Sequence, residues 1–123
     1  MNKQDFSIIK RTKSFSHAFR GIGILLKTTP NFWLHILIGT VLVILGVHYH
    51  IAHYDWMFLL LSIGLVLVTE AVNTAIEIDI DLTSPEYHPF ARDTKDVAAG
   101  VVLISGFILL AVSIIIFLPK IVG

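Results

Sequence analysis

Three long apolar segments are the feature that most limits what this chain can fold into. They cover about residues 32–50, 56–80 and 97–118 of a 123-residue sequence. A helix needs about 20 mostly apolar residues to cross the hydrocarbon core of a bilayer. Only 15% of the residues are charged, whereas a soluble domain has about 25%. The sequence therefore predicts an all-α membrane protein with three transmembrane helices.

A fourth segment, at about residues 14–28, has a different pattern. Its apolar residues recur at three- and four-residue spacing, and its basic residues lie off that stripe. This pattern is typical of an amphipathic helix that lies on the membrane surface. Pro30 follows and favours a turn into the first span. Because no repeat or flexible linker divides the chain, we expect residues 1–123 to form a single membrane domain.

The basic residues are unevenly distributed along the chain. Six of the nine Lys and Arg residues precede residue 30, the first loop has none, and the second loop has Arg92 and Lys95. The positive-inside rule therefore places the N-terminus and the second loop in the cytoplasm. The formal net charge of zero argues against nucleic acid as a partner. The absence of cysteines excludes disulfides and thiolate chemistry.

Polar residues interrupt the last third of the second apolar segment. Four of them, at spacings i, i+3, i+7 and i+11, share one helical face at about 100° per residue; they are Glu70, Asn73, Glu77 and Asp81, and we call this set the carboxylate face. Asp79 falls on the opposite side. A charged group inside a span costs roughly 2.5–3.5 kcal/mol on insertion scales. We therefore expect the carboxylate face to lie against other helices or a wet pocket.

The start of the third span offers a cation close to these acids. Lys95 and Asp96 lie just before its apolar run, and Thr94 or Asp93 is expected to cap the helix. The small residues 98–100 allow another helix to come close. We therefore expect Lys95 and Asp96 to lie near the exposed end of the carboxylate face.

Three interpretations of the carboxylate face are compatible with the residues. The first is a functional site, which is the default for ionisable groups inside a membrane. The second is a set of ion pairs that only fixes helix packing. The third is a proton or ion pathway, which is weaker because the polar residues stop half-way across the predicted spans.

Several histidines lie outside this face. His35, inside the first span, is interpreted as a polar group for helix packing or for a substrate cleft. His48, His50 and His53 cluster near the first loop. Three imidazoles can bind zinc, but the neighbouring aromatic residues favour an interfacial position without metal.

Two sequence blocks resemble the prokaryotic diacylglycerol kinase family, which includes undecaprenol kinases. The first is E-A-V-N-T-A-I-E-I-D-I-D at 70–81, continued by E-Y-H at 86–88, and the second is K-D-V-A-A-G at 95–100. The likeness extends to S-F-S-H-A-F-R-G at 14–21 and N-F at 31–32, so it covers nearly the whole chain. The combination of the two blocks at this distance is highly specific, whereas neither would be specific alone.

The resemblance implies a fold and an activity. The fold is a surface helix with three transmembrane helices, assembled in the bacterial cell membrane as a homotrimer whose active sites are shared between subunits. The activity is ATP-dependent phosphorylation of a primary hydroxyl on a membrane lipid, with Mg²⁺, at the cytoplasmic face. Undecaprenol and diacylglycerol are the alternative acceptors, and the S-P-E-Y-H-P loop at 84–89 favours undecaprenol.

The resemblance also implies a role for each site residue. Glu70 matches the catalytic base that binds the lipid hydroxyl and takes its proton. Glu77 matches a ligand of the ATP-bound Mg²⁺, with Asn73 in support, and Lys95 matches the residue that holds the ATP phosphates. The positions that match nucleotide-binding residues are Lys10, His17, Glu77, Asp81, Glu86, His88, Lys95 and Asp96.

Thr29 departs from the family pattern. It stands where a second metal-ligating Glu is usual, and a neutral hydroxyl is a poor magnesium ligand. Either another carboxylate, such as Asp81, completes the metal shell, or metal binding and turnover are reduced. The leading hypothesis, from the resemblance as a whole, is an active lipid kinase. The alternative is a weak or inactive family member that acts as a membrane scaffold.

Overall fold

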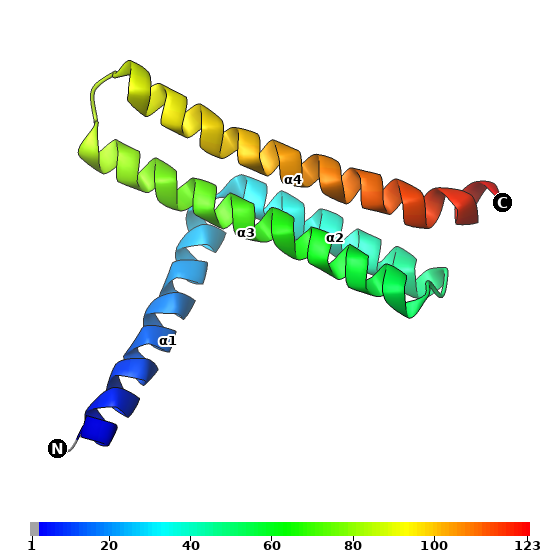
Figure 1. Cartoon of the computed structure of the whole chain (residues 1–123), viewed down its shortest axis with the longest axis horizontal. Coiled ribbons are helices and arrows are strands. Elements are labelled where there is room, and N and C mark those ends of the chain that lie inside the picture. Colours follow the sequence, from blue (N-terminus) through cyan, green and yellow to red (C-terminus); the bar gives the residue numbers. More distant parts are fainter. Residues whose placement is uncertain (1–2) are drawn as a thin grey trace. The chain divides into compact units, whose positions relative to one another are not determined.

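The computed structural model describes residues 3–123, with side chains for all of them except Asp5 and Phe6. The described residues form four helices, labelled in Figure 1: α1 (Lys3–Thr28), α2 (Pro30–His48), α3 (His53–Thr83) and α4 (Pro89–Val122). The chain forms two compact units, residues 1–30 and residues 31–123, and each is described by itself.

Three of the helices have the length and composition to cross a membrane. They are α2, α3 and α4, with mean hydropathies of 1.9, 1.9 and 3.1 over their most apolar windows. The expected all-α fold with three candidate membrane-spanning helices is thus confirmed for the described residues. The surface position of the N-terminal helix and the trimer stay predictions.

Helix α1 is longer than the apolar pattern indicates, because it begins at Lys3 rather than near residue 14. No Gly or Pro interrupts residues 3–13, so the backbone can remain helical ahead of the stripe. The hydroxyls of Thr12 and Ser14 donate to backbone carbonyls four residues earlier. Within this unit the aromatic rings of the stripe are not covered, since Phe15 and Phe19 are 69% and 70% exposed.

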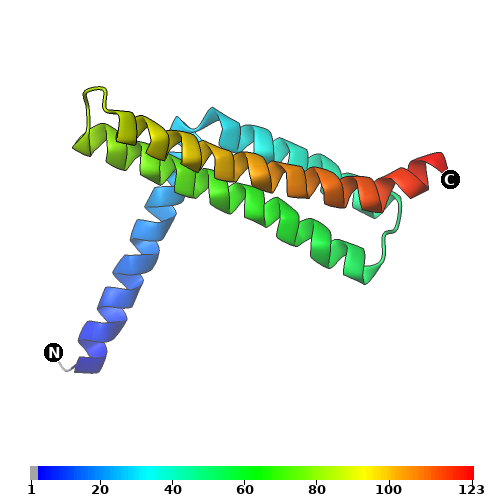
Figure 2. The same cartoon turned by 45° about the horizontal axis from the view of Figure 1, so that its top comes forward.

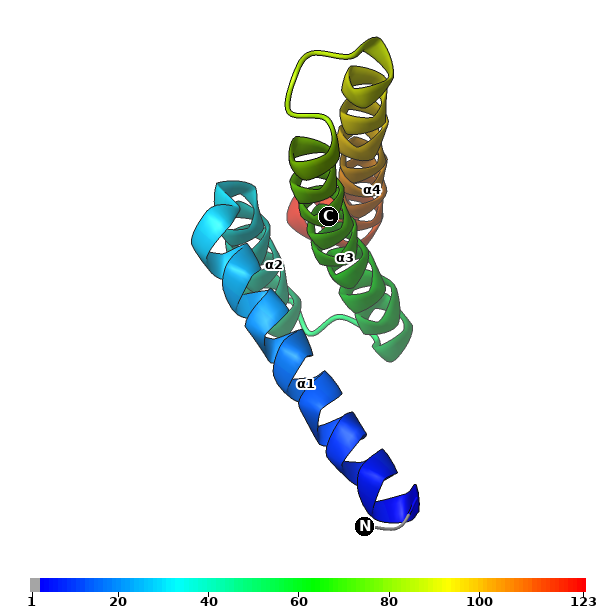
Figure 3. The ribbon, with the colours of Figure 1, turned by 90° about the vertical axis from the view of Figure 1, so that its left-hand side faces the viewer.

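In the second unit, α3 lies between α2 and α4, as Figure 3 shows. The side chains of Leu59 and Val66 on α3 are fully buried and pack against Leu109 and Ile116 of α4. Further toward the carboxylate face, the hydroxyl oxygens of Thr69 and Ser105 lie 2.8 Å apart and join the two helices. These contacts fix the orientation of the α3 face that carries Glu70.

Two glycines allow α2 to approach its neighbours closely. A Cβ atom placed on Gly39 would lie 2.8 Å from Cγ2 of Ile63, and one placed on Gly46 would lie 2.7 Å from the ring of Trp56. Both distances are too short for real atoms, so the side chains of Ile63 and Trp56 occupy the space that glycine leaves. Small residues serve this purpose widely in membrane helices.

The two loops of this unit lie at opposite ends of the helices, as Figure 2 shows. The loop from α3 to α4 covers residues 84–88. Helix α4 begins at Pro89, with His88 as its N-cap, and the Nδ1 atom of His88 accepts a hydrogen bond of 3.1 Å from the backbone N–H of Phe90. The prediction that Thr94 or Asp93 caps this helix is therefore wrong. Thr94 already lies inside the helix, where its hydroxyl donates to the carbonyl of Phe90.

Candidate functional site

The carboxylate face runs along α3 from a buried end to an exposed end. Glu70 is 3% exposed and Asn73 is 8% exposed, whereas Glu77 and Asp81 are exposed. Asp81 lies eleven positions after Glu70, which is about 16 Å along a helix that rises 1.5 Å per residue. The carboxylate face therefore extends from buried residues between the helices to exposed residues near the end of α3.

Glu70 lies against a histidine from the neighbouring helix. Its Oε2 atom is 3.5 Å from Nε2 of His35 on α2, and the side chain of His35 is 19% exposed. Sequence reasoning assigned His35 only to helix packing or to a substrate cleft. No pattern in the sequence could indicate this pairing, because the two residues lie on different helices and meet only when α2 packs against α3.

Asn73 connects the buried end of the face to Glu77. Its Nδ2 group donates to Oε1 of Glu77 across 3.5 Å. Its Oδ1 atom is buried and has no hydrogen-bond partner among the described residues. A buried polar atom without a partner is rare and points to an interaction that the protein alone does not supply. An amide oxygen next to a carboxylate suits a hard cation or a hydrogen-bond donor.

At the exposed end, a pocket of about 250 Å³ opens between α3, the 84–88 loop and α4. Five residues that sequence analysis assigned to nucleotide binding line it: Asp81, Glu86, His88, Lys95 and Asp96. Tyr87, from the E-Y-H turn at 86–88 that resembles the family, and Arg92 also line the pocket; Arg92 was not among the predicted site residues. Arg92 adds a second cation, and its Nε atom is 3.9 Å from Oδ2 of Asp96.

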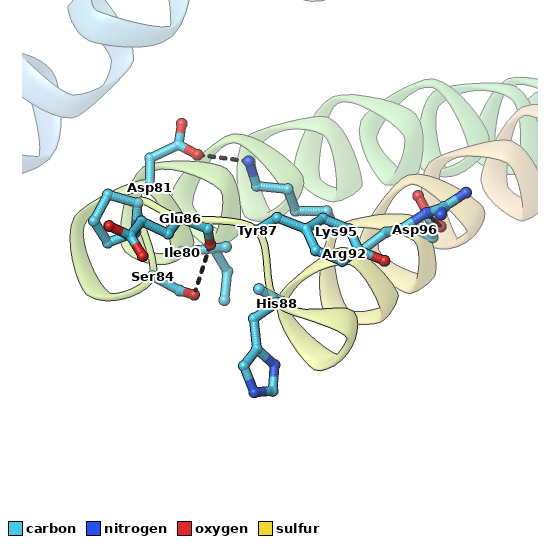
Figure 4. A pocket seen from close by; sticks show the side chains of 11 residues that line it. Ile80, Asp81, Ser84, Glu86, Tyr87, His88, Arg92, Lys95 and Asp96 are labelled. Carbon is cyan, nitrogen blue, oxygen red and sulfur yellow. Dashed lines mark hydrogen bonds and ion pairs between the residues drawn. The ribbon is translucent and has the colours of Figure 1, made fainter.

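Lys95 and Asp81 meet across this pocket, as Figure 4 shows. The Nζ atom of Lys95 donates to Oδ1 of Asp81 at 2.5 Å, which brings α4 to α3 as the sequence led us to expect. The two side chains are 39% and 68% exposed. Exposed ion pairs contribute little to stability because water and salt screen them. Lys95 can therefore exchange Asp81 for another anionic partner at small cost.

Two of the predicted nucleotide-binding residues lie on α1. Lys10 and His17 are exposed on this helix, which belongs to the first unit. Their part in the site stays a prediction. Thr29 lies between α1 and α2, where its backbone N–H donates to the carbonyl of Leu25 at 3.0 Å.

The described residues do not gather three or more His, Cys, Asp or Glu side chains in a group that could hold a metal ion. The histidines near the first loop, His48, His50 and His53, are not brought together as such a group. Magnesium differs from zinc, because it is commonly held by one or two carboxylates while phosphate oxygens and water complete its shell. Glu77 and the unpartnered Oδ1 atom of Asn73 fit an ion of this kind that arrives with a nucleotide.

The fold and the carboxylate face define a small helical membrane protein with ionisable residues concentrated at one end of its candidate spans. Residues 16–117 match the family model of the prokaryotic diacylglycerol kinases. The chain therefore belongs to the prokaryotic diacylglycerol kinase family, as its motifs predicted.

Curated relatives support this assignment. The chain is 39% identical over 108 residues to the undecaprenol kinase of Bacillus subtilis (strain 168), covering 88% of each chain. It is 32% identical over 111 residues to a diacylglycerol kinase of Synechocystis sp., covering 89% of this chain and 63% of the relative. A diacylglycerol kinase of Helicobacter pylori is 25% identical over 107 residues, covering 81% of this chain and 84% of the relative. These names support a lipid kinase.

Proposed function

We propose that this protein is an ATP-dependent kinase that phosphorylates the primary hydroxyl of a membrane lipid. The observation that carries the proposal is the arrangement along α3. A buried carboxylate, Glu70, shares one helical face with a cation-bearing pocket at the helix end. Family membership supports the kinase class. The match to an undecaprenol kinase over 88% of both chains favours undecaprenol over diacylglycerol as the acceptor.

In the proposed reaction, the lipid hydroxyl oxygen bonds to the γ-phosphorus of ATP. The bond between that phosphorus and the β–γ bridging oxygen breaks, and ADP leaves with the bond's electron pair. The hydroxyl proton passes to Glu70, which later releases it to water. Phosphoryl transfer depends mainly on positioning and charge stabilisation, and a positioned base that accepts the proton adds to the rate.

The pocket at the α3–α4 loop is the proposed nucleotide site. Lys95 exchanges its contact with Asp81 for the ATP phosphates, and Arg92 supplies further positive charge. Glu86, His88 and Asp96 line the same pocket and offer hydrogen bonds to the nucleotide. Lys10 and His17 of α1 complete the proposed set.

Glu77 and Asn73 would hold the Mg²⁺ that accompanies ATP. Their oxygens lie between the proposed proton acceptor and the nucleotide pocket in chain order. When bound, this ion neutralises charge on the phosphate oxygens. Asn73 also holds Glu77 through its Nδ2 group, so the carboxylate is already oriented.

The proposed setting is a bacterial cell membrane. The N-terminus and the α3–α4 loop lie in the cytoplasm, where ATP is available, according to the distribution of Lys and Arg. A homotrimer with shared sites is part of the proposal, as the family resemblance implies.

The direct test uses purified protein in detergent micelles with labelled ATP and Mg²⁺. We expect label to pass to undecaprenol faster than to diacylglycerol at equal mole fraction in the micelle. A faster reaction with diacylglycerol would reverse the acceptor assignment. A folded trimeric protein that labels neither lipid would overturn the kinase proposal.

Thr29 specifically favours the second candidate function, a weak or inactive member that serves as a membrane scaffold. If the missing carboxylate limits metal binding, Thr29→Glu should lower the Mg²⁺ concentration that gives half-maximal activity by several-fold. Glu77→Gln should raise it by at least about 10-fold, the scale on which metal sites respond to loss of a supporting group. Both values come from Mg²⁺ titrations at saturating ATP.

Leu118→Ala, at the far end of α4, is the control for this titration and should leave the Mg²⁺ requirement unchanged. An unchanged requirement in Thr29→Glu would show that another group already completes the shell. A wild-type protein that remains inactive at all Mg²⁺ concentrations, together with a Thr29→Glu variant that is active, would assign the native chain to the scaffold class.

A further inference from the structure

His35 is a polar residue on a helix that is otherwise apolar along its middle. Its Nε2 atom lies 3.5 Å from Oε2 of Glu70, so the side chain connects α2 to α3. The next residue, Ile36, lines an apolar groove between the same two helices. The imidazole of His35 therefore lies between the apolar groove of α2 and α3 and the buried carboxylate of Glu70.

Helix packing alone does not account for a histidine at this position. The α2–α3 contact is already supplied by close approaches at Gly39 and Gly46. A polar group within a membrane helix costs free energy unless it finds a partner, and such groups are functional more often than structural. The partner found here is the side chain proposed to accept the hydroxyl proton.

We propose that His35 is a positioning residue for Glu70. Its Nε2 atom lies 3.5 Å from Oε2, so the imidazole holds the carboxylate in one orientation. This inference rests on the proposed lipid kinase function. A distance of 3.5 Å is long for a hydrogen bond, and catalytic hydrogen bonds commonly shorten when the substrate binds.

The atom that makes the contact allows a sharp test with two polar variants of His35. Glutamine places its amide nitrogen near the position of Nε2, whereas asparagine, which is one carbon shorter, places it near the position of Nδ1. Loss of a hydrogen bond to a charged group predicts that His35→Asn lowers kcat for lipid phosphorylation roughly 10- to 100-fold. The KM for ATP should stay unchanged, and His35→Gln should keep most of the wild-type kcat. Leu37→Ala, 60% exposed on the same helix, is the control and should match the wild type.

The contact can also be observed without turnover. In protein labelled with ¹⁵N-histidine, the ring signals of His35 are identified by their absence in His35→Gln. We expect Glu70→Gln to shift these signals, because it replaces the carboxyl group that lies next to Nε2 with an amide. This measurement decides the question even if His35→Asn does not fold. An unshifted His35 ring in folded Glu70→Gln protein would overturn the inference.

The remaining outcomes each decide the matter. Equal kcat losses in the two polar variants, or full kcat in His35→Asn, would overturn the positioning role of His35 and leave the kinase proposal in place. A rise in the KM for ATP with unchanged kcat would assign His35 to nucleotide binding instead and overturn the inference. A wild-type protein that phosphorylates neither lipid would overturn the proposed function and this inference with it.

Discussion

Glu70→Gln is expected to lower kcat for lipid phosphorylation roughly 100- to 10,000-fold, the range contributed by a positioned general base. Glutamine has nearly the size of glutamate, so it fills the same buried position, where Glu70 is only 3% exposed. It cannot accept a proton, and the lipid hydroxyl then lacks its base. The KM for ATP should change little, because Glu70 does not line the nucleotide pocket. Transfer of label from ATP to lipid in micelles measures both constants.

Asp79→Asn is the matched control for this variant. It removes a carboxylate from the same helix, but from the exposed side opposite the carboxylate face. We expect this control to keep wild-type kcat. Wild-type turnover in folded Glu70→Gln protein would remove Glu70 from proton acceptance. An equal loss in Asp79→Asn would show that the effect comes from helix charge rather than from the face.

Lys95→Met should produce the second large effect, a loss in the use of ATP as a substrate. We expect kcat/KM for ATP to fall roughly 100- to 1,000-fold, as when a preorganised donor to a developing negative charge is removed. Lys95→Arg should retain part of the activity, because it keeps the charge but presents it on a larger, planar group. Steady-state kinetics with ATP as the varied substrate check both expectations.

Lys120→Met controls for the loss of one positive charge, because Lys120 lies in the last turn of α4, far along the helix from the pocket. It should leave kcat/KM for ATP unchanged. The stability of Lys95→Met should also be close to that of the wild type, since the pair it breaks with Asp81 is solvent-exposed. An undiminished kcat/KM in Lys95→Met would remove Lys95 from phosphate binding.

The parts of the fold that depend on local pattern were predicted from the sequence. Long apolar runs predicted the three candidate spans, and the spacing of Glu70 and Asp81 predicted that they share a face. The approach of Lys95 to Asp81 was also predicted, because Lys95 lies just before the third apolar run and Asp81 lies at the end of the second. The residue at which α4 begins was not predicted from the sequence. Its first residues are not apolar, and the cap that fixes them is a histidine at 88, an unusual capping residue.

The parts that depend on contacts between helices could not be read from the chain. The pairing of His35 with Glu70 arises from the angle and depth at which α2 packs on α3. The unpartnered oxygen of Asn73 likewise appears only when burial is known. Arg92 was noted as a nearby cation, but its place in the pocket wall depends on helix α4 beginning eight residues before the apolar run.

In the proposed reaction, the burial of Glu70 also limits the hydrolysis of ATP by water. A base in contact with bulk solvent would activate water as readily as an alcohol, and the nucleotide would then be hydrolysed without product. At 3% exposure, Glu70 has little contact with water from the surrounding solution. A hydroxyl delivered from within the bilayer reaches such a base more easily than water does, so exclusion of solvent suppresses the side reaction. Under the proposed mechanism, the depth of this one carboxylate favours transfer of phosphate to the lipid over hydrolysis of ATP.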